Sequence, residues 1–200
     1  MAVTPVPAQL QNLLDQIDAC ERDARALAGD LTDAQLNWQP GDTAWSVGQC
    51  LEHLALINVF YLKGMDAAVQ AAVQRGTSAF RDLAPTVLGR WFVAQMEPPV
   101  RLKVQTLASL VPPSAVSRDQ VQQRYEASHE AYRDLVKACA EVDVNQVIVR
   151  NPFYRLIRMR MATVVLVIPA HDRRHLWQAR QLVADPRFPH ESPVTASPRG

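Results

Sequence analysis

Apolar residues recur along the chain at spacings of three and four, which is the pattern of amphipathic helices. One stripe follows Pro7 and consists of Leu10, Leu13, Leu14, Ile17, Ala24, Leu27 and Leu31. Another consists of Val121, Tyr125, Ser128, Tyr132, Leu135, Val136 and Cys139. The segment from Leu51 to Leu62 is apolar on nearly every side, as expected for a central helix. These patterns predict three long helices.

Proline marks where long helices fit, because it removes a backbone donor and clashes with the preceding helical turn. Three stretches, 8–39, 41–84 and 114–151, contain no proline, and each holds one of these patterns. A fourth helix is expected from about Met159 to Ala184, with a kink near Pro169. The proline distribution therefore agrees with the hydrophobic pattern on four long helices.

Four such helices predict an all-α protein with the architecture of a four-helix bundle. The connection from about Thr77 to Pro113 is too long for a tight turn, so it allows the second and third helices to run parallel. A short helix is expected within it, at Val87 to Gln95. Strand signals are weak, since there is neither sustained alternation nor an Asn-Gly or Asp-Gly turn. The bundle domain is expected over 1–184, followed by a mobile Pro-rich tail over 185–200.

The second helix has a clear predicted start. Ser46-Val47-Gly48-Gln49 matches a capping box, in which the Ser side chain and the Gln side chain each bond the other residue's backbone. Trp45, just before the cap, can pack on Cys50 in the first turns of the helix. Thr32-Asp33-Ala34-Gln35 matches a second capping box, for a short helix after the first long one.

Composition and charge exclude some classes of protein. Twenty-one Lys and Arg against twenty Asp and Glu give a net charge of +1, so a wholly electrostatic nucleic-acid partner is not expected. The most apolar run, 161–170, is half of the ~20 residues that a membrane span needs, so no membrane association is expected. Cys20, Cys50 and Cys139 are scattered across helical patterns, which favours reduced, buried thiols. Without a recognisable signal at the start, we expect a cytoplasmic protein.

Histidine carries the candidate chemistry. His171 and His175 are four residues apart, so on a helix they share one face with Cβ atoms about 6 Å apart. Two imidazoles so placed can reach one metal ion at about 2.0–2.1 Å each. His53 lies in the most apolar helix, where a neutral imidazole needs either hydrogen-bond partners or a metal. If the two helix faces pack together, three imidazoles converge; a core histidine at position 53 is the alternative.

Two motifs resemble those of a known family. Trp45-Ser46-Val47-Gly48-Gln49-Cys50-Leu51-Glu52-His53-Leu54 and His171-Asp172-Arg173-Arg174-His175-Leu176-Trp177-Gln178 are similar to the helix-two and helix-four signatures of the DinB-like superfamily of metal-binding bundles. The resemblance covers about residues 7–183. It implies an up-down-down-up bundle with one divalent ion, zinc or nickel, on His53, His171 and His175. Pro169, two residues before the first helix-four ligand, departs from the family pattern.

The resemblance also implies a range of activities. Members include thiol transferases that use bacillithiol, a mycothiol-dependent isomerase and metal-dependent hydrolases. The leading hypothesis is a metal-dependent thiol S-transferase or hydrolase that acts on a small molecule through metal-bound thiolate or water, with a low-molecular-weight thiol as one cofactor option. The alternative is a non-catalytic bundle that holds a metal or an apolar ligand. A homodimer is a further option.

Other side chains are candidates for supporting roles. His129 is either a proton donor lining the pocket or a histidine at the edge of a packed stripe. Asp172 is either a general base or an ordinary solvated or paired carboxylate. Gln178, three residues after His175, is a candidate to orient that imidazole. Trp91 and Phe92 either cap the pocket or pack in the core.

Overall fold

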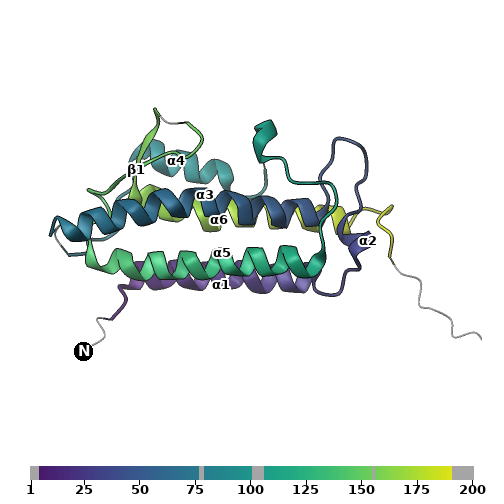
Figure 1. Ribbon diagram of the computed structural model, residues 1–200, viewed down its shortest axis with the longest axis horizontal. Helices are drawn as coiled ribbons and strands as arrows, with labels where there is room; N and C mark the ends of the chain where they lie inside the picture. Colours follow the sequence, from purple (N-terminus) through teal and green to yellow (C-terminus); the bar gives the residue numbers. More distant parts are fainter. Residues whose placement is uncertain (1–4, 77–78, 101–105, 155, 191–200) are drawn as a thin grey trace, which may run out of the picture.

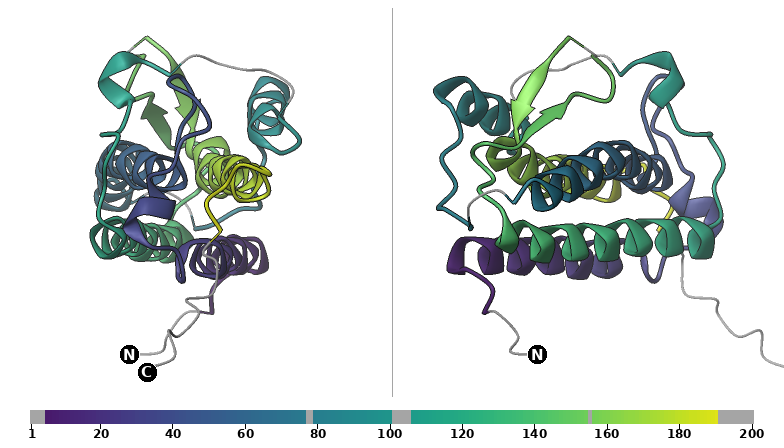
Figure 2. Two further views of the ribbon diagram at one scale, coloured as in Figure 1. Left: turned by 90° about the vertical axis from the view of Figure 1, so that its right-hand side faces the viewer. Right: turned by 60° about the vertical axis from the view of Figure 1, so that its left-hand side comes forward.

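Four long helices lie side by side in two layers in the computed structural model, which describes residues 5–76, 79–100, 106–154 and 156–190. One layer consists of α1 (Ala8–Ala28) and α5 (Arg118–Ala138), and the other of α3 (Val47–Gln74) and α6 (Met161–Val183) (Figures 1 and 2). Contacts between α3 and α5, α3 and α6, α1 and α5, and α1 and α6 close the four helices around a common core. The predicted all-α class is confirmed for a mostly helical chain.

The predicted helix starts are present as hydrogen bonds. At α3 the Ser46 Oγ accepts from Gln49 N at 3.1 Å, and Gln49 Oε1 accepts from Ser46 N at 3.0 Å. The same reciprocal pair forms between Thr32 and Gln35 at the short helix α2 (Asp33–Leu36). Both capping boxes are confirmed. Each satisfies backbone donors that a helix end otherwise leaves without partners.

The long connection between α3 and α5 contains two short helices. The helix predicted at Val87 to Gln95 is α4 (Val87–Met96), whose N-cap Thr86 accepts from Gly89 N at 3.0 Å. The 3₁₀ helix η1 (Ala108–Leu110) follows it. Helix α4 packs on α6, on the side of the α3/α6 layer that faces away from α1 and α5 (Figures 1 and 2). The connection therefore covers one face of the bundle.

A small hairpin between α5 and α6 was not predicted, because the strand signals in the sequence are weak. After the 3₁₀ helix η2 (Cys139–Glu141), strands β1 (Ile148–Arg150) and β2 (Arg158–Arg160) pair antiparallel. Each has three residues, which is too short to produce a visible alternation. In the loop between them, Asn151 Oδ1 accepts from Phe153 N and Tyr154 N at 2.9 Å each. This bonding holds Phe153 and Tyr154 over the α3/α6 layer.

Helix α6 runs through Pro169 as one element. A proline at this position cannot donate to the carbonyl of Val165, four residues earlier. Tyr132, fully buried on α5, donates its hydroxyl to that Val165 oxygen at 2.7 Å. A side chain of the neighbouring helix therefore replaces the missing backbone bond. The kink near Pro169 stays a prediction.

The segment after α6 packs back on the bundle. Phe188 is 4% exposed, and its ring meets Trp38 edge-on with centroids 5.4 Å apart. Gln35 donates to Pro189 O at 2.8 Å. Residues 185–190 of the predicted mobile tail are thus in contact with the loop around α2, and residues 191–200 lie outside the described part of the chain.

The three cysteines are free and buried, as predicted. Burial raises the pKa of Cys20, Cys50 and Cys139 to about 12 each, so all three are neutral thiols at physiological pH. A buried neutral thiol is a poor nucleophile, which removes these residues from the candidate chemistry.

Within the described ranges, no helix combines the length and apolarity that crossing a bilayer requires.

Gly89 is expected to control how closely α4 approaches α6. A Cβ there would lie 2.5 Å from Thr163 Oγ1 and 3.0 Å from its Cγ2, and Thr163 is buried and stiff at χ1. Gly89→Ala should lower the free energy of unfolding by about 1–3 kcal/mol, although alanine is the better helix former. Urea denaturation measures the change. Gly41→Ala is the control, because a Cβ at Gly41 meets nothing within 4 Å; equal stability of the two variants would contradict the close approach.

Candidate metal centre

Three imidazoles meet between α3 and α6. His53 comes from the second turn of α3, and His171 and His175 come from successive turns of α6. One ring nitrogen from each lies within 4.8 Å of the other two. The Nε2 atoms of His171 and His175 are 3.2 Å apart. Two nitrogens bound tetrahedrally to one zinc ion are about 3.3 Å apart, given bonds of about 2.0–2.1 Å. The α6 pair therefore already has the spacing of a shared ion.

Two of the rings are oriented by hydrogen bonds on their far side. His53 Nδ1 lies 3.1 Å from Leu110 O, and a carbonyl can only accept, so Nδ1 carries the proton. His175 Nδ1 donates in the same way to Gln178 Oε1 at 3.0 Å. Both rings are thus left with an unprotonated Nε2, which is the tautomer that binds a metal. The expected contact of Gln178 with His175 is present.

His171 shows why the cluster fits a cation. Its Nδ1 is buried and has no hydrogen-bond partner among the described residues. If that nitrogen carries the proton, the Nε2 lone pairs of His171 and His175 face each other. If Nε2 carries it, this repulsion is absent. In both cases the buried Nδ1 is left without a partner, at a cost of about 1–3 kcal/mol. When Nδ1 carries the proton, a cation bound between the two Nε2 atoms would remove the repulsion between their lone pairs. The donor set therefore matches a metal ion.

The surroundings keep the histidines uncharged. Burial lowers the pKa of His175 to about 3, and it lowers the pKa of His53. Burial, with the neighbouring His175 and His53, holds the pKa of His171 well below its ordinary value. A metal ligand must be a neutral imidazole, so these residues need not lose a proton to bind an ion near pH 7.

Trp45 forms a wall of the cluster that the sequence did not predict. Its ring stacks on His175 at an interplanar angle of 19° with centroids 5.6 Å apart, and it lies 4.8 Å from the ring of His53. The sequence placed Trp45 only as a partner for Cys50. No sequence signal marks this contact, because it depends on how α3 and α6 cross.

His129 and Asp172 meet each other elsewhere in the core. His129 Nε2 lies 2.6 Å from Asp172 Oδ2, and Tyr125 donates to the same oxygen at 3.0 Å. Both His129 and Asp172 are fully buried. Asp172 is therefore a paired carboxylate and not a solvated one, and His129 is inside the packed core and not at its edge. Neither is part of the described three-histidine cluster.

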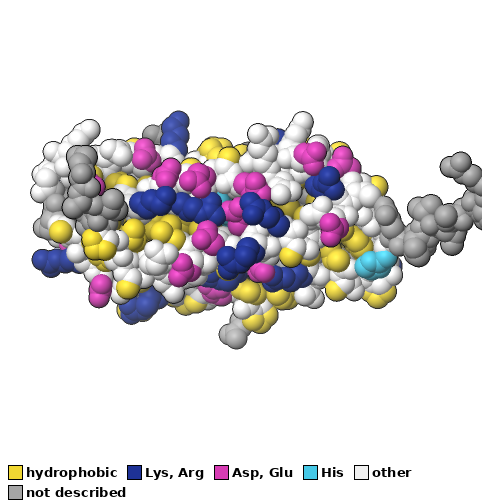
Figure 3. All heavy atoms as spheres, turned by 90° about the horizontal axis from the view of Figure 1, so that it is seen from below, with side chains coloured by type: hydrophobic (Ala, Val, Ile, Leu, Met, Phe, Trp, Pro, Cys, Tyr) yellow, Lys and Arg dark blue, Asp and Glu magenta, His cyan; other side chains and the backbone are white. Residues whose placement is uncertain are grey.

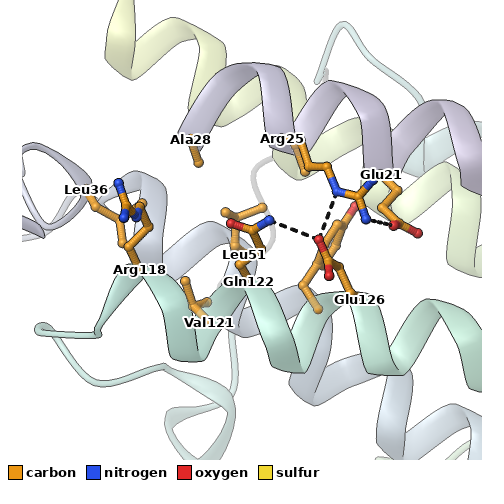
Figure 4. A pocket seen from close by; sticks show the side chains of 11 residues that line it. Glu21, Arg25, Ala28, Leu36, Leu51, Arg118, Val121, Gln122 and Glu126 are labelled. Carbon is orange, nitrogen blue, oxygen red and sulfur yellow. Dashed lines mark hydrogen bonds and ion pairs between the residues drawn. The ribbon is translucent and has the colours of Figure 1, made fainter. Parts of the chain in front are cut away.

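Charged side chains continue from this pair to the surface of α1 and α5. Glu21 lies 3.7 Å from His129 Nδ1, and it pairs with Arg133 and, at 2.6 Å, with Arg25. Arg25 in turn bonds Glu126 at 2.9 Å (Figure 4). The pocket beside these residues has a volume of about 10 Å³, enough for about one water molecule. On this face of the molecule acidic and basic side chains are interspersed (Figure 3).

A larger cavity opens beside the histidines, with a volume of about 160 Å³. It lies between α3 and α6 on one side and α4, η1 and the hairpin loop on the other. The described residues that line it are His53, Ile57, Tyr61, Phe92, Met96, Thr106, Leu107, Leu110, Phe153, Tyr154, Val167 and His171. Phe92 is thus at the cavity, as one interpretation of the sequence had it, whereas Trp91 is 55% exposed and absent from this lining.

The fold and the cluster define a mostly helical protein with a candidate three-histidine metal centre and an adjoining cavity. The sequence profile of the DinB superfamily matches residues 16–179, which include all three histidines. The chain belongs to the DinB superfamily. In the same comparisons no curated protein and no solved structure matches it.

The His129–Asp172 pair should contribute strongly to stability. His129→Ala leaves a buried carboxylate with Tyr125 as its donor, and removing one partner of a buried pair costs about 3–5 kcal/mol. Urea denaturation should show this loss. His129→Gln restores an N–H donor and should recover part of the stability. His190→Ala, at an exposed histidine, is the control; a His129→Ala protein as stable as this control would contradict the pairing.

Proposed function

We propose that the protein binds one divalent metal ion per chain through His53, His171 and His175, and that it is a metal-dependent enzyme acting on a small molecule. The observation that carries the proposal is the 3.2 Å separation of two neutral Nε2 atoms beside a third oriented imidazole. Imidazole ligands suit zinc and nickel, the two ions that we propose. Three protein ligands leave a coordination position open, as in catalytic zinc sites.

The chain's own groups prepare the site for chemistry. Leu110 O and Gln178 Oε1 hold the His53 and His175 rings in a metal-binding orientation, and Trp45 shields both from solvent. Apolar side chains of α4 and the hairpin loop line the cavity on the other side of the histidines. When bound, the ion would supply a Lewis acid that lowers the pKa of a coordinated water or thiol.

Of the two reaction classes, the site favours a thiol S-transferase over a hydrolase. Hydrolysis by water is helped by a general base, and none of the described residues that line the cavity is Asp or Glu. Asp172 and His129 are occupied with each other in the core. A thiol needs only to be deprotonated, and coordination to a bound ion would favour its thiolate form. The alternative, a non-catalytic metal- or ligand-binding bundle, is supported by the same shortage of acid–base groups.

We also infer that the four long helices have the up-down-down-up connectivity. Three sets of contacts support it, with α3 and α5 parallel, α1 and α6 parallel, and α1 antiparallel to α5. Between α3 and α5, Glu52 contacts Arg124 and Asn58 contacts Ser128. Between α1 and α6, Gln16 contacts Arg173 and Asp23 contacts Arg180. Between α1 and α5, Asp18 contacts Arg133 and Arg25 contacts Glu126. In each parallel set the residue numbers rise together, and in the last set they run in opposite directions.

Partners and location are further proposals. The cavity's size supports a small-molecule substrate. Three free, buried thiols support a reducing compartment such as the cytoplasm. No nucleic-acid partner is proposed, given the net charge of +1.

Purified protein without an affinity tag should contain about one divalent ion per chain. His171→Ala and His175→Ala should each lose most of it, because two ligands on one helix act as a preorganised pair. Elemental analysis measures the content, with His190→Ala as the control that keeps its metal. Circular dichroism should show that the chelated protein stays helical, since a large apolar core does not need the ion to fold. Equal metal in the wild type and a His171→Ala/His175→Ala double variant would refute the site.

A cobalt-substituted protein should respond to an added thiol. Millimolar 2-mercaptoethanol is expected to change its visible spectrum, because a thiolate is a soft ligand for the open position. The change should disappear in His53→Ala. A spectrum that stays constant, in protein shown to hold one cobalt per chain, would exclude the transferase and leave the hydrolase or the non-catalytic alternative.

A further inference from the structure

We propose that the cavity beside the histidines accepts an uncharged, apolar group about the size of a benzene ring, and that such a group is the part of the substrate that distinguishes it. This inference rests on the proposed function, because it concerns what is held next to the metal ligands. Three observations carry it: the chemistry of the lining, the volume of the cavity, and the pairing of the nearest charges.

The lining is apolar apart from the histidines and three hydroxyl-bearing side chains. Phe92 and Met96 of α4, Leu107 and Leu110 at η1, Phe153 of the hairpin loop, and Ile57 and Val167 of the bundle face it. In the part of the chain that the structure describes, none of its lining residues is Asp, Glu, Lys or Arg. Tyr61 accepts a hydrogen bond from Asn151 at 3.2 Å, so its oxygen is already partnered. A charged group in this space would give up part of its hydration without gaining a counter-ion among the described lining residues.

The volume sets the size of the group. The cavity holds about 160 Å³. An apolar cavity of about 150 Å³ lined by Leu, Ile and Phe is large enough to bind benzene, whereas drug-sized ligands occupy pockets of about 300–1,000 Å³. The cavity therefore fits one aromatic ring or a short branched alkyl group. His53 and His171 form part of its wall, so a group bound in the cavity lies next to the proposed metal ligands.

The nearby arginines of α6 are engaged by other partners. Arg173 bonds both carboxylate oxygens of Glu97, at 2.5 and 2.9 Å, and also Gln16 at 2.8 Å. Arg174 donates to Gln95 O at 2.9 Å. These contacts connect α6 to the C-terminal end of α4. They direct the two guanidinium groups to the α4 end and α1, so neither group provides an anion site in the cavity.

The test compares two probes of similar shape, benzyl alcohol and benzylammonium, with zinc-loaded protein at neutral pH. Saturation-transfer NMR or calorimetry measures binding, and the metal content of each sample is measured in parallel. Benzyl alcohol should bind about tenfold more tightly than benzylammonium, because burying the ammonium is unfavourable. The same preference should persist after chelation, since the proposed contacts are with the apolar lining.

Two variants test the location. Val167→Phe fills the cavity and should weaken benzyl alcohol by about tenfold or more. Leu107→Glu adds a carboxylate at a residue that is 41% exposed, so it tests the cavity without altering the buried core; it should reverse the preference toward benzylammonium. Leu88→Glu is the matched control, on α4 but outside the lining and 73% exposed, and should change neither affinity.

The outcomes separate the two proposals. Benzyl alcohol binding in a protein that takes up no zinc when zinc is supplied supports the cavity and refutes the metal centre. A protein with one zinc per chain that binds neither probe, or binds both equally, overturns the cavity proposal and leaves the metal centre intact. Leu107→Glu and Leu88→Glu with the same effect would also overturn it, because the binding would then lie elsewhere.

Discussion

The buried carboxylate of Asp172 fixes the rotation of α6, and the geometry of the candidate site depends on that rotation. Successive residues on a helix point about 100° apart. Because His129 and Tyr125 of α5 hold Asp172 in the core, His171 must point away from it, toward α3 and the cavity. His175, one turn later, shares that direction. A rotation of α6 that separated the imidazoles would also break the pairing of a fully buried charge.

The parts that the sequence predicted are those determined by local spacing. Helix periodicity, the two capping boxes and the α4 segment depend on residues within a few positions of each other, and all are present. The same holds for His171 and His175, whose shared face follows from a separation of four. Placing His53 with them required the resemblance, because no local rule says which faces of two distant helices will meet.

The parts that the sequence missed are long-range contacts. Asp172 precedes two arginines, a context typical of a surface, and its partner His129 lies 43 positions away. Trp45 reaches His175 only because two helices cross. The hairpin is held by pairing between strands too short to carry a pattern, with Asn151 organising the loop between them. Each of these features contributes to the cavity or to the orientation of its walls, so its lining could not be derived from periodicity.

The bond from Tyr132 to the Val165 carbonyl has a consequence for how the helices slide past one another. Helices with uniform apolar stripes can pack in several axial registers, each shifted by about one 5.4 Å turn, with similar burial of apolar area. The proline at 169 leaves one specific carbonyl of α6 without its helical donor, and a single hydroxyl on α5 matches it. A shift of one turn would leave a buried acceptor and a buried hydroxyl unsatisfied together. The proline therefore selects one axial register for the packing of α6 against α5.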